Sequence, residues 1–163
     1  MKRFVCLILL GSMLLSGCNV MQERIKEPVT FYYVRKNYQE DMGEVIASEV
    51  REASGHRYDL PYLLALYSMG PSDKDLISLL PRNVTILPVE HSEDGLVLSL
   101  LDEFHALEDA DFTLASACLA MTCMELIETE QVTVLCGDRS ITLNRENLML
   151  SSSIIPKIPE EQK

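Results

Sequence analysis

Phe112 to Ile127 (FTLASACLAMTCMELI), followed closely by Gln131 to Cys136 (QVTVLC), is the stretch that decides the fold. The first part is apolar on nearly every side, which predicts a buried helix with Thr113 or Asp111 as its cap. The second part is typical of a strand, and Gly137-Asp138 predicts a turn after it. A buried helix followed at once by a strand indicates a mixed fold of helices on a sheet.

Working outward, four further stretches are predicted to be strands because they are β-branched, aromatic or bounded by turn residues: 29–35, 44–53, 84–90 and 96–101. Pro88 predicts an edge strand or a bulge, and the last two strands form a hairpin. Short extended pieces are expected at 141–143 and 148–150.

A second helix is predicted to open at Asp59-Leu60-Pro61, with Asp59 as its cap and Pro61 in the first turn. Gly70-Pro71 ends this helix, since glycine adopts positive φ readily and proline cannot continue the helix. Residues 72–78 are expected to form a short helical turn. The order β-β-α-β-β-α-β predicts an α+β fold, with a mostly antiparallel sheet of about five strands and two helices on one face.

The N-terminus has the three parts of a secretory signal: Lys2-Arg3, an apolar stretch from Phe4 to Leu15, and small residues before Cys18. The apolar run is shorter than the ~20 residues of a spanning helix. Leu15-Ser16-Gly17-Cys18 resembles the lipobox of bacterial lipoproteins, which implies cleavage before Cys18 and a diacylglyceryl group on its thiol. The alternative is an uncleaved signal anchor. We therefore expect a signal peptide (1–17), a tether (18–28), one domain (29–145) and a tail (146–163), on the extracytoplasmic face of the cytoplasmic membrane.

The chain carries 14 Lys and Arg against 25 Asp and Glu, a net charge of −11. Such an acidic chain repels polyanions, so no nucleic acid partner is expected. Besides Cys18, the predicted mature chain has three cysteines, Cys118, Cys123 and Cys136, all in apolar surroundings where a free thiol behaves as a small hydrophobe. A bridge from Cys136 to Cys118 or to Cys123 is the alternative.

Three motifs in a fixed order resemble the GerMN domain of sporulation and spore germination proteins. They are Leu66 to Pro71 followed by Leu76 to Pro81, the hairpin from Val84 to Leu101 with the segment ending at Phe104, and Leu114 to Thr122. The resemblance covers residues 29–145 and departs from the family at Leu101-Asp102. It implies an extracytoplasmic lipoprotein of spore-forming bacteria, with a fold similar to the ring-building domains of secretion machines.

No catalytic pattern of the G-x-S-x-G, H-E-x-x-H or P-loop type occurs in the sequence. The three histidines, His56, His91 and His105, fall in predicted loops and turns. The acidic segment 102–111 lacks the spacing of a calcium loop. We therefore expect no enzyme, no cofactor and no metal site, but a membrane-anchored binding or assembly module of a cell-envelope complex. The alternatives are a cell-wall hydrolase or its regulator, and a receptor for a small ligand.

The expected partner is an envelope protein, with self-association as a further possibility. In the strand at 29–35, aromatic residues follow one another, so Tyr32 and Tyr33 point to opposite faces. One of them lies away from the core unless the strand is covered on both sides. We expect that open face to dock a basic partner, with the acidic side chains of Glu103, Glu108 and Asp109 at its rim.

Overall fold

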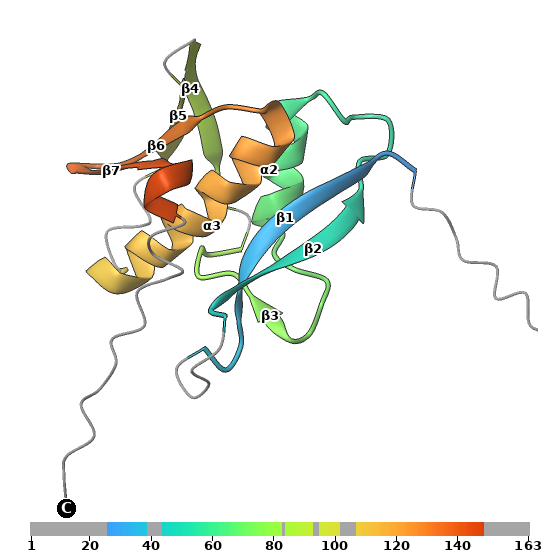
Figure 1. Cartoon of the computed structure of the whole chain (residues 1–163), viewed down its shortest axis with the longest axis horizontal. Coiled ribbons are helices and arrows are strands. Elements are labelled where there is room, and N and C mark those ends of the chain that lie inside the picture. The colour runs from blue at the N-terminus through green and yellow to red at the C-terminus, as the bar shows by residue number, and fades with distance from the viewer. Residues whose placement is uncertain (1–25, 39–43, 83, 93–94, 102–106, 149–163) are drawn as a thin grey trace, which may run out of the picture.

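The computed structural model describes residues 26–38, 44–82, 84–92, 95–101 and 107–148. It has the predicted α+β class, but with two sheets in place of one, mostly antiparallel, against which the helices pack (Figure 1). The elements are β1 (Pro28–Arg35), β2 (Ile46–Glu52), α2 (Leu60–Ser68), β3 (Leu76–Ile77), β4 (Ile86–Ser92), β5 (Gly95–Leu100), α3 (Asp109–Ile127), β6 (Gln131–Cys136) and β7 (Arg139–Asn144).

The smaller sheet has the order β2-β1-β3, and both pairs are antiparallel. Val29, Phe31 and Tyr33 of β1 alternate inward and are buried. The Tyr33 ring stacks on the Tyr67 ring of α2, with centroids 4.8 Å apart, and the Phe31 ring meets Tyr67 edge to face at 5.8 Å. These rings form the part of the core that fixes α2 against β1.

The larger sheet has the order β4-β5-β6-β7. β4 and β5 form the predicted hairpin, in which Pro88 lies on the edge strand beside a break in register, as predicted. β5 and β6 are parallel, because α3 lies between them in the chain. Gly137 has a φ of 59° in the predicted turn, and β7 then returns antiparallel to β6.

The prediction of one sheet is wrong because α3 occupies the edge of β1 that another strand would need. The backbone N–H of Tyr32 donates to the Thr122 hydroxyl of α3 over 2.9 Å. The Tyr67 hydroxyl donates to the Tyr32 carbonyl over 3.2 Å. Two side chains thus satisfy the edge of β1 at Tyr32, and α3 separates the two sheets (Figure 1).

α2 begins as predicted, with the Asp59 carboxylate accepting the Tyr62 N–H over 3.1 Å. It ends at Ser68, ahead of Gly70, whose φ is +84°. Arg51 of β2 donates to the carbonyls of Leu66 and Gly70 over 3.3 and 3.1 Å. The predicted helical turn at 72–78 is wrong at Leu76–Ile77, which pair with the end of β1.

The loop after α2 is held by Glu49, whose carboxylate accepts the N–H groups of Ser72 and Asp73 over 2.8 and 2.7 Å. Glu49 also lies 3.6 Å from Arg51, and both side chains are largely buried. Hydrogen bonds from β2 therefore hold the segment around Gly70-Pro71 in place, in addition to the helix that this motif ends.

α3 begins at Asp109, three residues before its predicted start, and its N-cap is Glu108, so the predicted caps Thr113 and Asp111 are wrong. Among the described helices, α3 alone has the length and composition of a membrane span, but it is a core helix packed on β1, β6 and β7. Residues 145–148 are helical, which contradicts the extended structure expected at Leu148; Met149 and Leu150 lie outside the described residues.

Candidate functional site

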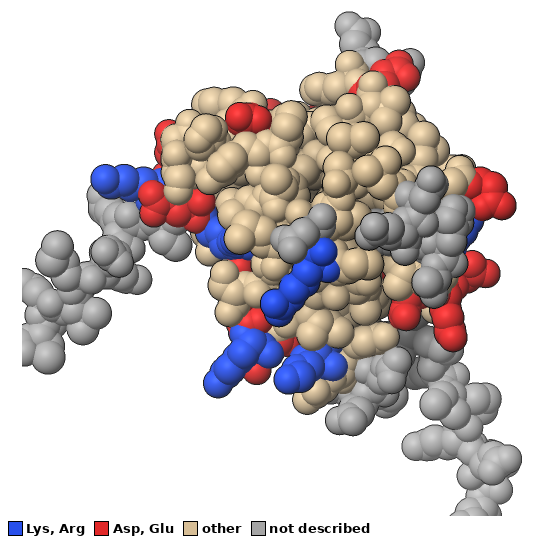
Figure 2. Space-filling view, turned by 180° about the vertical axis from the view of Figure 1, so that it is seen from behind, with Lys and Arg blue, Asp and Glu red and all other residues tan. Residues whose placement is uncertain are grey.

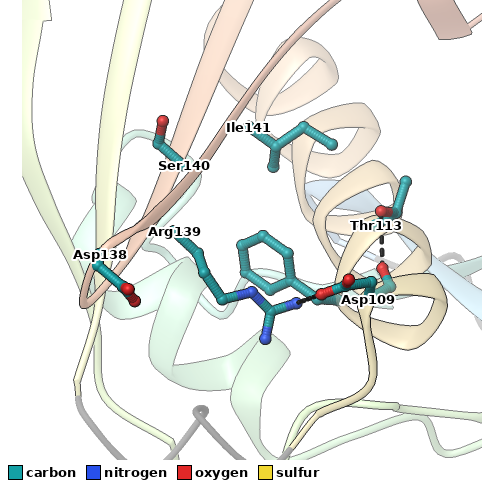
Figure 3. Close-up of a pocket in the computed structure, with 7 residues that line it drawn as sticks. Asp109, Thr113, Asp138, Arg139, Ser140 and Ile141 are labelled. Carbon is teal, nitrogen blue, oxygen red and sulfur yellow. Dashed lines mark hydrogen bonds and ion pairs between the residues drawn. The ribbon is translucent and has the colours of Figure 1, made fainter.

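A hollow of about 450 Å³ lies between the first turn of α3 and the β6–β7 hairpin (Figure 3). Asp109, Phe112 and Thr113 line it from α3. Asp138, Arg139, Ser140 and Ile141 line it from the hairpin. α3 runs antiparallel to β1, begins at this end of the molecule and leads away from it to β6. β6 then runs back, and the hairpin that joins it to β7 turns at the same end (Figure 1).

Arg139 is the central side chain of the hollow. Its guanidinium donates to the Leu107 carbonyl over 2.9 Å and lies 3.3 Å from the Asp109 carboxylate. Its charged carbon also lies 4.0 Å from the centre of the Phe112 ring, within the range of a cation–π contact. With 22% of its side chain exposed, Arg139 is a fixed positive charge in the floor of the hollow.

The first turn of α3 is acidic, with Asp109 and Asp111 after Glu108 at the cap. No side chain caps the helix with a hydrogen bond. Carboxylates near a helix N-terminus are favoured by the helix dipole, by about 0.3–1 kcal/mol each at exposed positions. The Thr113 hydroxyl donates to the Asp109 carbonyl one turn back, over 2.8 Å. Glu108, Asp109 and Asp111 of the acidic segment therefore form the start of α3.

The chemistry offered by the hollow is recognition by charge and hydrogen bonding. Asp109 and Asp138 supply carboxylates at the rim, Thr113 and Ser140 supply hydroxyls, and the Arg139 guanidinium lies 3.3 Å from the exposed Asp109 carboxylate. The lining contains no His, Cys or Lys that could serve as a base beside a hydroxyl. Across the described parts of the chain, no group of three or more His, Cys, Asp or Glu side chains is arranged to hold a metal ion. This arrangement suits a ligand that carries a positive charge or hydroxyl groups.

The structure separates the residues predicted to share one docking surface. Glu108 and Asp109 lie at the start of α3, whereas Glu103 lies outside the described residues. The Tyr32 hydroxyl donates to Glu125 over 2.7 Å, near the other end of α3. Glu125 and Asp109 are sixteen residues apart on one helix, or ~24 Å. Tyr32 and the acidic turn thus do not form a single surface.

Of the two tyrosines, Tyr33 is 1% exposed and its hydroxyl donates to the Tyr67 carbonyl over 3.0 Å. It belongs to the core, so its expected place on a partner surface is wrong. Tyr32 points away from the core, as one of the two was predicted to do, but its ring is half-buried and its hydroxyl is bonded to Glu125. Burial, followed by the hydrogen bond to Glu125, raises the pKa of Tyr32 to about 12.

Sequence reasoning missed Asp138 and Arg139 as site residues. Their signal is weak, since a charged residue after Gly137 is ordinary for an exposed turn. Thr122, at the end of the third motif, makes two hydrogen bonds: its hydroxyl donates to the Cys118 carbonyl one turn back over 2.9 Å and accepts the Tyr32 N–H. His56 and His91 are in the described residues and lie outside the hollow, while His105 lies outside the described residues.

The three domain cysteines, Cys118, Cys123 and Cys136, are buried and form no disulfide, so neither of the alternative bridges is present. Burial raises the pKa of the Cys118 and Cys123 thiols to about 12. They are consequently poor nucleophiles and act as small core side chains. Cys18 lies outside the described residues.

No protein-family model, no curated protein and no solved structure matches this chain.

Proposed function

We propose that the chain is a lipid-anchored, non-enzymatic binding or assembly module of a cell-envelope complex. The resemblance to the GerMN domain favours a complex of sporulation or germination. The observation that carries the proposal is that the hollow lies between the first turn of α3 and the β6–β7 hairpin. Figure 1 shows these two elements at the end of the domain opposite to the start of β1.

This placement follows from the antiparallel course of β1 and α3. Glu27, just before β1, is where the chain enters the domain. The last turn of α3 lies at the same end, because the Arg57 guanidinium donates to the Leu126 carbonyl over 3.1 Å. Beyond the end of β1, Tyr38 donates to Asp111 in the first turn of α3 over 3.4 Å. An anchor at Cys18 would therefore hold the entry end near the lipid and leave the hollow facing outward.

Charge supports a protein partner with a basic side chain at the hollow. Asp109 and Asp138 line the hollow and Glu108 is exposed next to Asp109 in the chain, while Arg139 supplies one positive charge against these three carboxylates. On the face seen from behind, Lys and Arg side chains gather in the lower part and acidic ones lie mostly at the margins (Figure 2). Such a segregated charge pattern favours one orientation of encounter and makes the association rate sensitive to salt.

A photo-crosslinking residue at position 140, in place of Ser140, first captures the partner in cells. The test is then the rate at which the full-length protein associates with that partner. Glu108→Gln combined with Asp138→Asn should slow association at low salt and have less effect at high salt. Glu52→Gln with Glu44→Gln removes the same charge from exposed positions of β2 and the loop before it, and is the matched control. Equal rates for both double variants at low salt would contradict the proposal.

A receptor for a small ligand is a second candidate, because the volume of the hollow falls within the ~300–1,000 Å³ of ligand pockets. Its lining is mostly polar, whereas ligand pockets are mostly apolar, and this favours the protein partner. The third alternative, a cell-wall hydrolase, is tested by a zymogram on purified wall material. Clearing by the protein would refute the non-enzymatic proposal.

A further inference from the structure

The end of the domain where the chain enters is built around Glu27. The Glu27 carbonyl accepts the Ala53 N–H over 3.1 Å, and its carboxylate accepts the Gly55 N–H over 2.8 Å. These bonds tie the last residue before β1 to the loop that joins β2 to α2. In Figure 1, the start of β1, the end of β2 and this loop lie together at one end of the molecule.

The loop holds one aromatic side chain out of the domain. Tyr58 is 96% exposed, the highest value among the exposed large hydrophobic residues of the described chain. The backbone below it is ordered by two turns: His56 N–H donates to the Ala53 carbonyl over 2.9 Å, and Asp59 N–H donates to the His56 carbonyl over 3.0 Å. In the first turn Ser54 and Gly55 have φ of 50° and 85°, the geometry of a tight turn with two left-handed residues.

Arg57 attaches the loop to the end of α3. Its guanidinium donates to the Leu126 carbonyl at the end of α3 and lies 6.0 Å from the centre of the Tyr58 ring. Tyr58 is therefore presented from a fixed backbone, next to a cation.

We infer that the Tyr58 loop is the surface of the domain that meets the lipid bilayer, with the Tyr58 ring at the level of the headgroups. The inference rests on the proposed lipid anchor at Cys18. From Cys18 to Glu27 the chain spans at most ~32 Å when fully extended. A domain of about 117 residues is ~35 Å across. A tether of this length limits how far the entry end can move from the membrane, and so favours orientations in which this end, with the Tyr58 loop, lies on the membrane side.

The chemistry of the loop favours a neutral lipid surface over a protein. Tyrosine concentrates at membrane interfaces, where its ring contacts acyl chains and its hydroxyl stays hydrated. Exposed carboxylates of Glu52, Asp59 and Glu128 surround the loop and disfavour anionic headgroups. A single ring does not hold a protein on a bilayer. It sets the orientation of a domain that acyl chains already hold, so that the hollow points away from the lipid.

The absence of tryptophan from the sequence makes a direct test possible. Tyr58→Trp places a single indole in the loop of the full-length protein, purified with its lipid and reconstituted in phosphatidylcholine vesicles. We expect the indole emission to shift to shorter wavelength and to lose intensity when brominated phosphatidylcholine replaces the normal lipid. Leu101→Trp is the matched control: Leu101 is 48% exposed, and its neighbour Leu100 pairs with Cys136 at the end of β6 nearest the hollow. The emission of this control variant should show neither change.

Flotation of the vesicles separates failure of the anchor from failure of the orientation. Protein that does not float with the vesicles would refute both the lipid anchor and the inference built on it. If both variants float, but the emissions of Tyr58→Trp and Leu101→Trp are equally quenched or equally unaffected, the anchor stands and the orientation is refuted. A shift of the Tyr58→Trp emission to shorter wavelength that appears only after a protein partner is added, without quenching by the brominated lipid, would assign the loop to that partner instead of the lipid.

Discussion

Replacing Thr122 by valine tests the contact that separates the two sheets. The Thr122 hydroxyl is fully buried, accepts the Tyr32 N–H over 2.9 Å and donates to the Cys118 carbonyl over 2.9 Å. Valine has nearly the same shape but no acceptor, so Thr122→Val leaves a backbone donor of β1 without a partner inside the protein. Such a loss costs about 1–3 kcal/mol.

For a domain of this size, 1 kcal/mol corresponds to a change in Tm of about 4 °C, so Thr122→Val should lower Tm by about 4–12 °C. The assay is thermal and urea unfolding followed by circular dichroism. Thr113→Val is the matched control, because the Thr113 hydroxyl also donates to a carbonyl one turn back on α3 but is exposed and accepts no N–H. Thr113→Val should change stability by less than ~0.5 kcal/mol. Equal destabilisation by the two variants would show that the Tyr32 contact contributes nothing.

Three further outcomes follow from the described contacts. Arg51→Met removes the donor to the Leu66 and Gly70 carbonyls and leaves the buried Glu49 carboxylate without its cation. The urea midpoint of unfolding should therefore fall by the equivalent of about 3 kcal/mol. The control variant Arg35→Met breaks an exposed pair with Glu44 and should cost less than ~1 kcal/mol. The thiol pKa values of Cys118 and Cys123 are raised from 9.0 to about 12 in the folded state, so the stabilisation they provide is present below pH 9 and is lost as pH rises from 9 towards 12. Urea unfolding should therefore show a loss of about 1.4 kcal/mol per thiol between pH 8 and pH 10, and Cys123→Ala should remove one such contribution; an unchanged slope in that variant would contradict the assignment. Arg139→Ala should loosen the start of α3, seen as faster exchange of the first hydrogen-bonded amides of the helix, at residues 112–115, while exchange at the far end of the helix stays unchanged.

Local patterns in the sequence predicted the individual strands and the start of α2 closely. β6 has the predicted bounds, and the β4–β5 hairpin and the cap at Asp59 were also predicted. These features depend on residues that are neighbours in the chain. The alternation of side chains in a strand and the preference of aspartate for a helix N-cap are properties of short segments.

The division into two sheets could not be predicted, because it depends on a bond between Tyr32 and Thr122, ninety residues apart in the sequence. Nothing in the strand pattern of β1 shows that a helix, and not a strand, lies along its edge. The same limit applies to β3, whose two residues form a strand only by pairing with Val34 and Arg35.

Glu108 and Asp109, which the sequence predicts at the rim of a partner surface, are exposed at the start of α3, and their contact with a partner stays a prediction. The sequence places Arg139 in an ordinary turn after β6, and only the return of the chain through α3 brings it to Asp109 and Phe112. Tyr33 was misassigned because its burial depends on the rings of Phe31 and Tyr67. Tertiary packing therefore decides which of the predicted polar and aromatic residues remain available to a partner.

Both the proposed function and the orientation of the domain depend on a mature chain that begins at a lipidated Cys18. The most direct measurement is the intact mass of the protein extracted from membranes, with Cys18→Ala analysed in parallel. We predict that the wild-type chain lacks residues 1–17 and carries a diacylglyceryl group on Cys18, while Cys18→Ala keeps residues 1–17 and carries no lipid. A wild-type mass that retains residues 1–17, or that shows an unmodified Cys18, would contradict it.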